Sequence, residues 1–143
     1  MQKVFFHYAD RNLSIKEKKS IHQSIEYIFQ NENKPLERID YIFCSDDYLL
    51  EINKTYLQHD FYTDIVTFDL SNEDSKETIG EIYISIDRII DNAKKLHQPL
   101  FNEKLRVIFH GALHLCGYLD KKEVDEKLMR LKEDFYIQYH LNK

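Results

Sequence analysis

Two histidines and an aspartate form the group of residues with the clearest potential chemistry. His110 and His114 are four residues apart, and Asp120 follows six residues after the second histidine. Residues i and i+4 of an α-helix lie on one face, so a helix here would direct both imidazoles at one metal ion. Gly117 is a natural helix stop, because glycine adopts the left-handed conformation at a helix end without steric cost. The chain can then turn and bring Asp120 back as a third ligand.

This donor set is typical of a catalytic metal site rather than a structural one. Three protein ligands leave the fourth position of a zinc ion open for water, whereas structural zinc sites use four protein ligands. A carboxylate oxygen also shifts the preference toward harder ions such as manganese. We therefore expect one zinc ion, with manganese or another divalent ion as the alternative. Without a metal, one histidine would be a core residue bonded to backbone and the other exposed, and the spacing alone does not exclude this because the chain has seven histidines.

The bulk composition predicts a single soluble domain over residues 1–143. The chain is long enough to bury a core, and 43% of its residues are hydrophobic and 31% charged. No apolar run approaches the ~20 residues of a membrane span, and the first residues lack the apolar core of a secretion signal. Cys44 and Cys116 do not resemble a disulfide framework, and we expect Cys116 to be a small buried hydrophobe rather than a ligand. These features indicate a cytoplasmic protein with no membrane partner.

Net charge bears on the class of partner. The formal charge of −5 argues against nucleic-acid binding through bulk electrostatics, although a local patch matters more than the total.

Hydrophobic periodicity predicts about four strands and five helices. The strands are expected over residues 2–8, 38–44, 63–70 and 79–86, and the last two form an antiparallel hairpin with a polar tip. The helices are expected over residues 14–32, 48–56, 87–98, 101–116 and 125–141. Ser14 with Glu17 matches a capping box for the first helix, and Ser45 is a candidate N-cap for the second. The last helix carries its apolar residues at Leu128, Leu131, Phe135 and Tyr139.

This order of elements predicts an α+β fold with one mixed sheet covered by helices, because strands and helices do not strictly alternate. The stretch 101–116 is apolar on most sides, as a central buried helix would be. Such a helix holds two histidines rigidly, which is what a metal site requires.

The residues around the histidines resemble a known family. The stretch His110-Gly111-x-Leu113-His114-Leu115-x-Gly117-Tyr118 resembles the signature of the YbeY family, bacterial metal-dependent endoribonucleases of ribosomal RNA maturation. Asn53-x-x-Tyr56, Asp60 and the run Thr63–Phe68 resemble a second family motif, N-x-x-Y-R-x-x-D-x-P-T-D-V-L-S-F. Gly80–Ser85 resembles its G-D-I-x-I-S strand. These matches extend from about residue 40 to residue 130.

The resemblance implies hydrolysis of single-stranded RNA during maturation of the 3′ end of small-subunit ribosomal RNA and in ribosome quality control. It implies the small ribosomal subunit and its assembly factors as partners, no DNA substrate, and a metal on His110, His114 and Asp120. His114 and Arg106 are then the expected catalytic residues, since Arg106 lies one turn before His110 and can reach a phosphate. The alternative for Arg106 is an ordinary surface cation that pairs with Glu103.

This chain departs from the family pattern at two positions. The family reads G-Y-D-H where this chain has Gly117-Tyr118-Leu119-Asp120, so Asp120 stands where a third histidine is expected. Leu57 occupies the position of an arginine that the family is thought to use on RNA, and His59 and Lys54, which flank it, are the candidate substrate-binding replacements.

The family's T-D pair corresponds to Thr63 and Asp64 in this chain. We expect both residues to satisfy backbone groups at a strand start, with a role in shaping the cleft as the alternative.

Two other functions fit parts of this pattern. A metallopeptidase also places His-x-x-x-His on a helix, but it needs a glutamate after the first histidine as general base, and Gly111 stands there. A ribosome-assembly factor with little or no catalysis would use the metal only to stabilise its fold, as Leu57 and Asp120 suggest. RNA cleavage separates this second alternative from the nuclease.

Overall fold

The computed structural model describes residues 1–143 and contains one four-stranded mixed sheet and five helices. The strands are β1 (Val4–Tyr8), β2 (Leu36–Cys44), β3 (Ile65–Asp69) and β4 (Thr78–Ser85). The helices are α1 (Lys18–Asn31), α2 (Asp46–Leu57), α3 (Ile86–Lys95), α4 (Leu100–Leu115) and α5 (Glu123–Leu141). The strand order is β1-β2-β4-β3, with β3 antiparallel to β4 and the other pairs parallel. The predicted α+β class and the predicted hairpin are confirmed.

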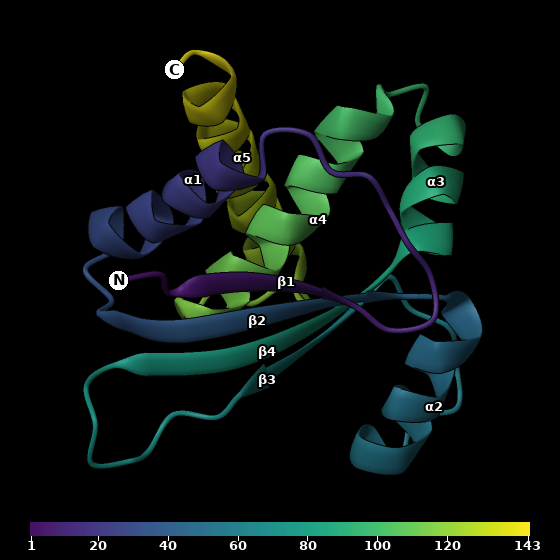
Figure 1. Ribbon diagram of the computed structural model, residues 1–143, viewed down its shortest axis with the longest axis horizontal. Coiled ribbons are helices and arrows are strands. Elements are labelled where there is room, and N and C mark those ends of the chain that lie inside the picture. Colours follow the sequence, from purple (N-terminus) through teal and green to yellow (C-terminus); the bar gives the residue numbers. More distant parts are fainter.

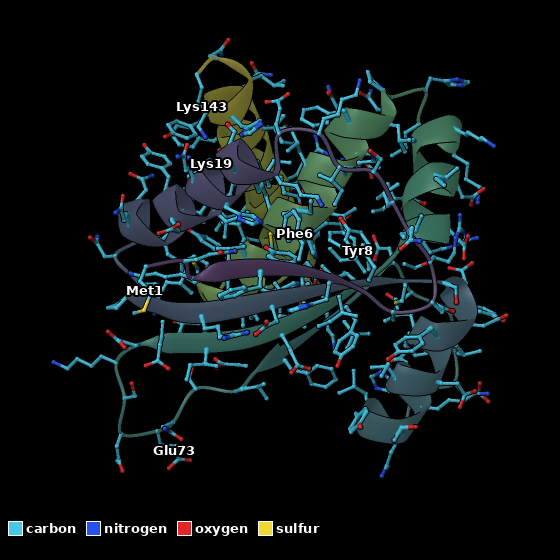
Figure 2. All side chains as sticks on the ribbon, viewed as in Figure 1. Met1, Phe6, Tyr8, Lys19, Glu73 and Lys143 are labelled. Carbon is cyan, nitrogen blue, oxygen red and sulfur yellow. The ribbon has the colours of Figure 1, made fainter.

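The core lies between one face of the sheet and a layer of helices. Figure 1 shows α1, α4 and α5 on the same side of the sheet, with α2 at the end of the strands. Alternate residues of a strand point to opposite faces, and Tyr41 of β2 and Ile82 of β4 are fully buried on the helical face. Phe6 and Tyr8 of β1 also project toward the helices, whereas Glu73 lies at the distant tip of the β3–β4 connection (Figure 2).

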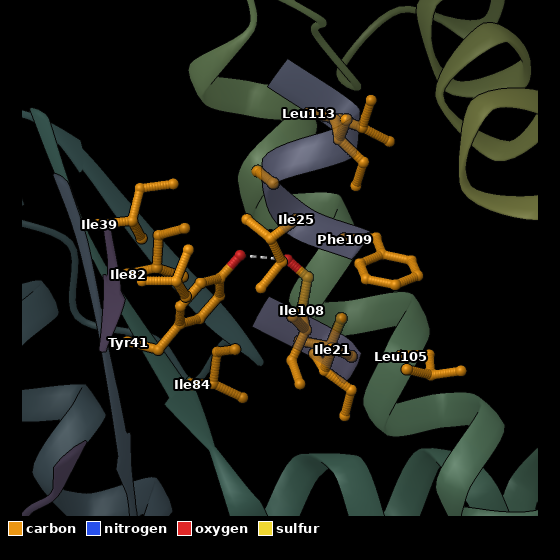
Figure 3. Packing of buried hydrophobic residues seen from close by; sticks show 14 of the residues in the cluster. Ile21, Ile25, Ile39, Tyr41, Ile82, Ile84, Leu105, Ile108, Phe109 and Leu113 are labelled. Atoms are coloured by element: carbon orange, nitrogen blue, oxygen red, sulfur yellow. Dashed lines mark hydrogen bonds between the residues drawn. The ribbon is translucent and has the colours of Figure 1, made fainter. Parts of the chain in front are cut away.

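Helix α4 is the central helix of this layer, as expected. Its Ile108 carbonyl accepts a hydrogen bond of 2.8 Å from the buried Tyr41 hydroxyl, which ties the middle of the helix to the sheet (Figure 3). A Cβ atom added to Gly111 would lie 2.9 Å from the Ile82 side chain, too close for ordinary contact. Glycine therefore allows α4 to approach β4 closely at the turn between the two histidines.

The end of α4 follows from Gly117. This glycine has φ +106°, a left-handed conformation that L side chains rarely adopt. The Gly117 N–H donates to the His114 carbonyl and the Tyr118 N–H donates to the Leu113 carbonyl, which is the Schellman pattern. The helix stop predicted from the sequence is confirmed.

The starts of two helices test the predicted caps. The Ser45 hydroxyl accepts from the Tyr48 N–H at 3.1 Å, so the N-cap of α2 is confirmed. The capping box at Ser14 is wrong, because α1 begins at Lys18 after Glu17, which has φ 62° and makes no side-chain cap bond. The Ser14 carbonyl instead accepts from Lys104 Nζ of α4 at 3.1 Å. The Ser14 segment therefore contacts α4 instead of starting α1.

The buried face of α5 also differs from the predicted one. Leu128, Leu131 and Phe135 are 43%, 67% and 54% exposed. The buried residues of this helix are Met129, Glu133, Tyr136, Ile137 and His140. The helix is therefore rotated so that two polar residues face the core, and one of them, Glu133, reaches the predicted site.

None of the five helices combines the length and the apolar character needed to cross a lipid bilayer.

Candidate metal centre

Three candidate ligand atoms converge at the end of α4. Asp120 Oδ2 lies 3.1 Å from His110 Nε2 and 3.2 Å from His114 Nε2. One donor atom from each residue lies within 4.8 Å of the other two. The histidines share one face of α4, and the turn at Gly117 returns Asp120 to them as the sequence predicts. The arrangement with one core histidine and one exposed histidine is not observed, since their side chains are 19% and 24% exposed.

The second nitrogen of each imidazole has its own acceptor. His114 Nδ1 donates to the Tyr118 carbonyl at 2.9 Å, and His110 Nδ1 donates to Glu133 Oε2 at 2.6 Å. A carbonyl and a carboxylate only accept, so Nδ1 of each ring carries a proton, and Nε2 is the nitrogen that would bind a metal ion. Metal-binding histidines in proteins are commonly oriented in this way by a second hydrogen bond. The donor set therefore fits a divalent metal ion.

Glu133 is the residue of this site that sequence reasoning missed. Its side chain is 5% exposed, and besides His110 it accepts from Arg106 Nη1 at 2.7 Å. No signal in the sequence pointed to it, because hydrophobicity favoured Leu128, Leu131 and Phe135 as the inner face of α5. An acidic residue on an apolar helix face needs a partner, because burying an unpaired charge is costly.

Acidic neighbours favour positive charge on His110. Burial opposes the charged imidazole, but the hydrogen bond and charge of Glu133, with Asp120 and Asp64, outweigh it and raise the pKa of His110. A bound cation would satisfy the same negative surroundings.

Arg106 pairs with two residues of α5 and not with Glu103. Its guanidinium donates to Glu133 and to Asp134, each at 2.7 Å. Glu103 is 4% exposed, its Oε1 has no hydrogen-bond partner, and burial raises the pKa of its carboxyl. The alternative in which Arg106 pairs with Glu103 is therefore wrong. The Arg106 side chain is 24% exposed and lines a cavity that also contains His110.

Two surface cavities meet at the candidate centre. Their volumes are about 250 and 530 Å³, and both are lined by Asp64, His110 and Asp120. The Asp64 backbone carbonyl accepts from the Ser85 N–H at 2.9 Å, and Thr63 Oγ1 lies 3.4 Å from the Ile65 carbonyl. Thr63 thus bonds a backbone carbonyl at the strand start, as expected, whereas Asp64 is bonded there only through its own backbone. Both residues line the larger cavity, as the alternative expects.

The two candidate replacements for the family arginine differ in position. His59 and Leu57 line the larger cavity together with His114. Lys54 does not line it, and its Nζ lies 3.5 Å from Asp60 and 3.7 Å from Glu51. Only His59 of this pair faces the candidate centre.

Comparison with known proteins connects this geometry to a family. The family model described as "Endoribonuclease YbeY" matches residues 6–140. The chain belongs to the YbeY family. Among curated relatives, Endoribonuclease YbeY of Flavobacterium psychrophilum is 47% identical over 131 residues, covering 92% of this chain and 91% of the relative. Endoribonuclease YbeY of Cytophaga hutchinsonii is 43% identical over the same length, with the same coverage of the two chains.

A solved structure supports the fold. The solution structure of TM1509 from Thermotoga maritima matches with a TM-score of 0.66 and 26% identity, over 97% of this chain and 89% of that one. The resemblance to the YbeY family read from the sequence motifs is confirmed.

Gly111, the packing glycine of α4, stands where the metallopeptidase alternative needs a glutamate.

Proposed function

We propose that this YbeY-family chain is a metal-dependent endoribonuclease that hydrolyses single-stranded RNA during ribosomal RNA maturation. One observation carries the proposal: both Nε2 atoms and the Asp120 carboxylate converge where two cavities meet. The curated relatives are named endoribonucleases. The two cavities leave the candidate centre open to a strand of RNA.

His110, His114 and Asp120 would hold the ion, which we propose to be zinc, with manganese as the alternative because one donor is a carboxylate oxygen. When bound there, a divalent ion would supply the acidity that activates water and the charge that polarises a phosphate. Glu133 and the Tyr118 carbonyl fix the orientation of the two imidazoles through their Nδ1 atoms.

We assign Arg106 a catalytic contact with the RNA phosphate. Its guanidinium lines the smaller cavity beside His110, and the two carboxylates of Glu133 and Asp134 hold it in place. A fixed cation next to the reacting phosphate offsets the negative charge that develops during hydrolysis. His59 is the proposed substrate contact in the larger cavity, and we propose no direct contact for Lys54 because it lines neither cavity.

The proposed biological setting is the bacterial cytoplasm, with ribosomal RNA, the small ribosomal subunit and its assembly factors as partners. The two cysteines are buried and unpaired, which suits a reducing compartment.

A non-catalytic assembly factor with a structural metal is the second candidate. It is favoured by the acidic wall of the larger cavity, where Asp64, Asp69 and Asp120 outnumber the single cation Lys121, and by Leu57. A metal that only stabilises the fold would leave RNA cleavage negligible.

Single-turnover cleavage of a single-stranded RNA distinguishes the two candidates. The parent, His114→Ala and the control His7→Ala are purified identically and loaded with zinc or manganese. His7 lies on β1 and its side chain is 47% exposed, so its loss leaves the centre intact. The nuclease proposal expects cleavage by the parent and His7→Ala but not by His114→Ala. No cleavage by any of the three, or equal cleavage by all, refutes it.

A further inference from the structure

The loop that follows α2 presents aromatic side chains at the wall of the candidate site. His59 and Phe61 line the 530 Å³ cavity that also contains His114 and Asp120. Their rings stack with centroids 5.1 Å apart and an angle of 20° between planes. Phe61 is 56% exposed, so much of its ring is in contact with solvent. Aromatic surface exposed in a cavity that holds a reactive centre is typical of ligand binding.

Hydrogen bonds fix the backbone of this loop. Asn53 is 1% exposed, and its side-chain Nδ2 donates to the Phe61 carbonyl at 3.0 Å. The backbone carbonyl of Asn53 accepts from the His59 N–H at 3.2 Å. The Tyr62 hydroxyl donates to Asp47 of α2 at 3.1 Å. The backbone that carries the two rings is therefore held in position before any ligand arrives, which reduces the conformational entropy lost when one binds.

The charges around the cavity provide little attraction for phosphates. Lys121 is the one lysine or arginine that lines it, against three aspartates, and Leu57 stands where the family carries an arginine. Lys54, the lysine nearest to Leu57 in the sequence, is paired with Glu51 and Asp60. Apart from Arg106 in the adjoining cavity, electrostatic attraction to the backbone of an RNA is thus weak, and a contact to the bases would add affinity.

We propose that His59 and Phe61, the aromatic platform, stack against a nucleobase of single-stranded RNA whose phosphate lies at the metal centre. This inference rests on the proposed function, adds Phe61 to the proposed contact at His59, and specifies that the two rings bind a base. Every base has a π-face, so such a platform tolerates any sequence, and stacking contributes roughly 5- to 150-fold in affinity per base. A base within a duplex is not free to leave its neighbours, so the platform selects single strands.

The first test measures RNA binding with Phe61→Leu. Binding of a short labelled single-stranded RNA is followed by fluorescence anisotropy in the His114→Ala background, so that the RNA is not cut. Phe61→Leu is expected to weaken binding at least fivefold. Phe135→Leu is the matched control, because Phe135 is exposed to a similar extent, 54%, but lies on α5 and lines neither cavity, and it is expected to bind as the parent does. Equal melting temperatures show that both variants are folded.

The second test removes the base instead of the ring. An abasic nucleotide is placed at each position of the RNA in turn. One position is expected to weaken binding to the His114→Ala protein and to have no further effect when Phe61→Leu is added to it, because the two changes remove the same contact. Affinity is expected to fall only about threefold between 50 and 200 mM salt, as for one phosphate contact to a single strand.

The outcomes separate this inference from the proposed function. Phe61→Leu that binds and cleaves RNA like the parent overturns the platform and leaves the nuclease proposal intact. Binding that depends on Phe61, in a parent that cuts no RNA, supports the platform and overturns the nuclease proposal.

Discussion

Replacing Glu133 with glutamine tests whether this buried carboxylate prepares His110 for a metal. Glu133 Oε2 lies 2.6 Å from His110 Nδ1, and Oε1 lies 2.7 Å from Arg106 Nη1. Glutamine has the same size and keeps an oxygen acceptor, but it removes the negative charge. His110 then becomes a less basic ligand, while its tautomer and position are retained.

The magnitude follows from what the substitution leaves in place. Loss of the partner that orients a metal-binding histidine costs about 10- to 100-fold in metal affinity, and the retained acceptor places Glu133→Gln near tenfold, about 1.4 kcal/mol. Stability falls as well, because Arg106 loses one of two charged partners and keeps only Asp134. We expect a decrease of about 2 kcal/mol in the free energy of unfolding of the metal-free protein.

Competition with a chelator of known zinc affinity measures the dissociation constant of each variant, and urea denaturation measures its stability. The control is Asp134→Asn, which removes the other carboxylate of Arg106 without touching His110. Because Asp134 is 53% exposed, this variant should lose at most about 1 kcal/mol of stability and no zinc affinity. A zinc affinity of Glu133→Gln equal to the parent's, or an equal loss in both variants, would refute the reasoning.

Three further predictions concern packing, the cysteines and the metal. Gly111→Ala should lower stability by about 1–3 kcal/mol despite the better helix propensity of alanine, because its Cβ would lie 2.9 Å from Ile82; an unchanged urea midpoint contradicts this. Burial raises the pKa of the Cys44 and Cys116 thiols to about 12. Neither thiol should therefore react with Ellman's reagent at pH 8 until the protein is unfolded, and rapid reaction of the native protein would contradict this. Removing the metal with a chelator should lower the melting temperature, because a free ion concentration of a hundred times the dissociation constant stabilises the folded state by about 2.7 kcal/mol. A melting temperature that neither falls on chelation nor recovers with zinc argues against a bound ion.

Local rules explain why the centre of the site could be predicted from the sequence. The i, i+4 spacing places His110 and His114 on one helix face, and Gly117 ends the helix in the Schellman pattern. The return of Asp120 to the histidines follows from that turn. Each of these steps involves residues close in the chain, where spacing and backbone preference determine geometry.

Long-range contacts explain what the sequence did not predict. Ser14 and Glu17 have the right residue types for a capping box, but α1 begins at Lys18. The Ser14 carbonyl accepts instead from Lys104 of α4, a contact that no local pattern predicts. Hydrophobicity alone favoured Leu131 and Phe135 as the inner face of α5, yet both are exposed. Glu133 is buried because its partners lie on α4, and no pattern within α5 reveals those partners.

The most direct test of the account is the anomalous diffraction of crystals grown from zinc-loaded protein. We expect one strong peak in contact with Nε2 of His110, Nε2 of His114 and the carboxylate of Asp120. A peak bound by other residues, or no peak at this position in fully loaded protein, would contradict the central claim that these three side chains hold the ion.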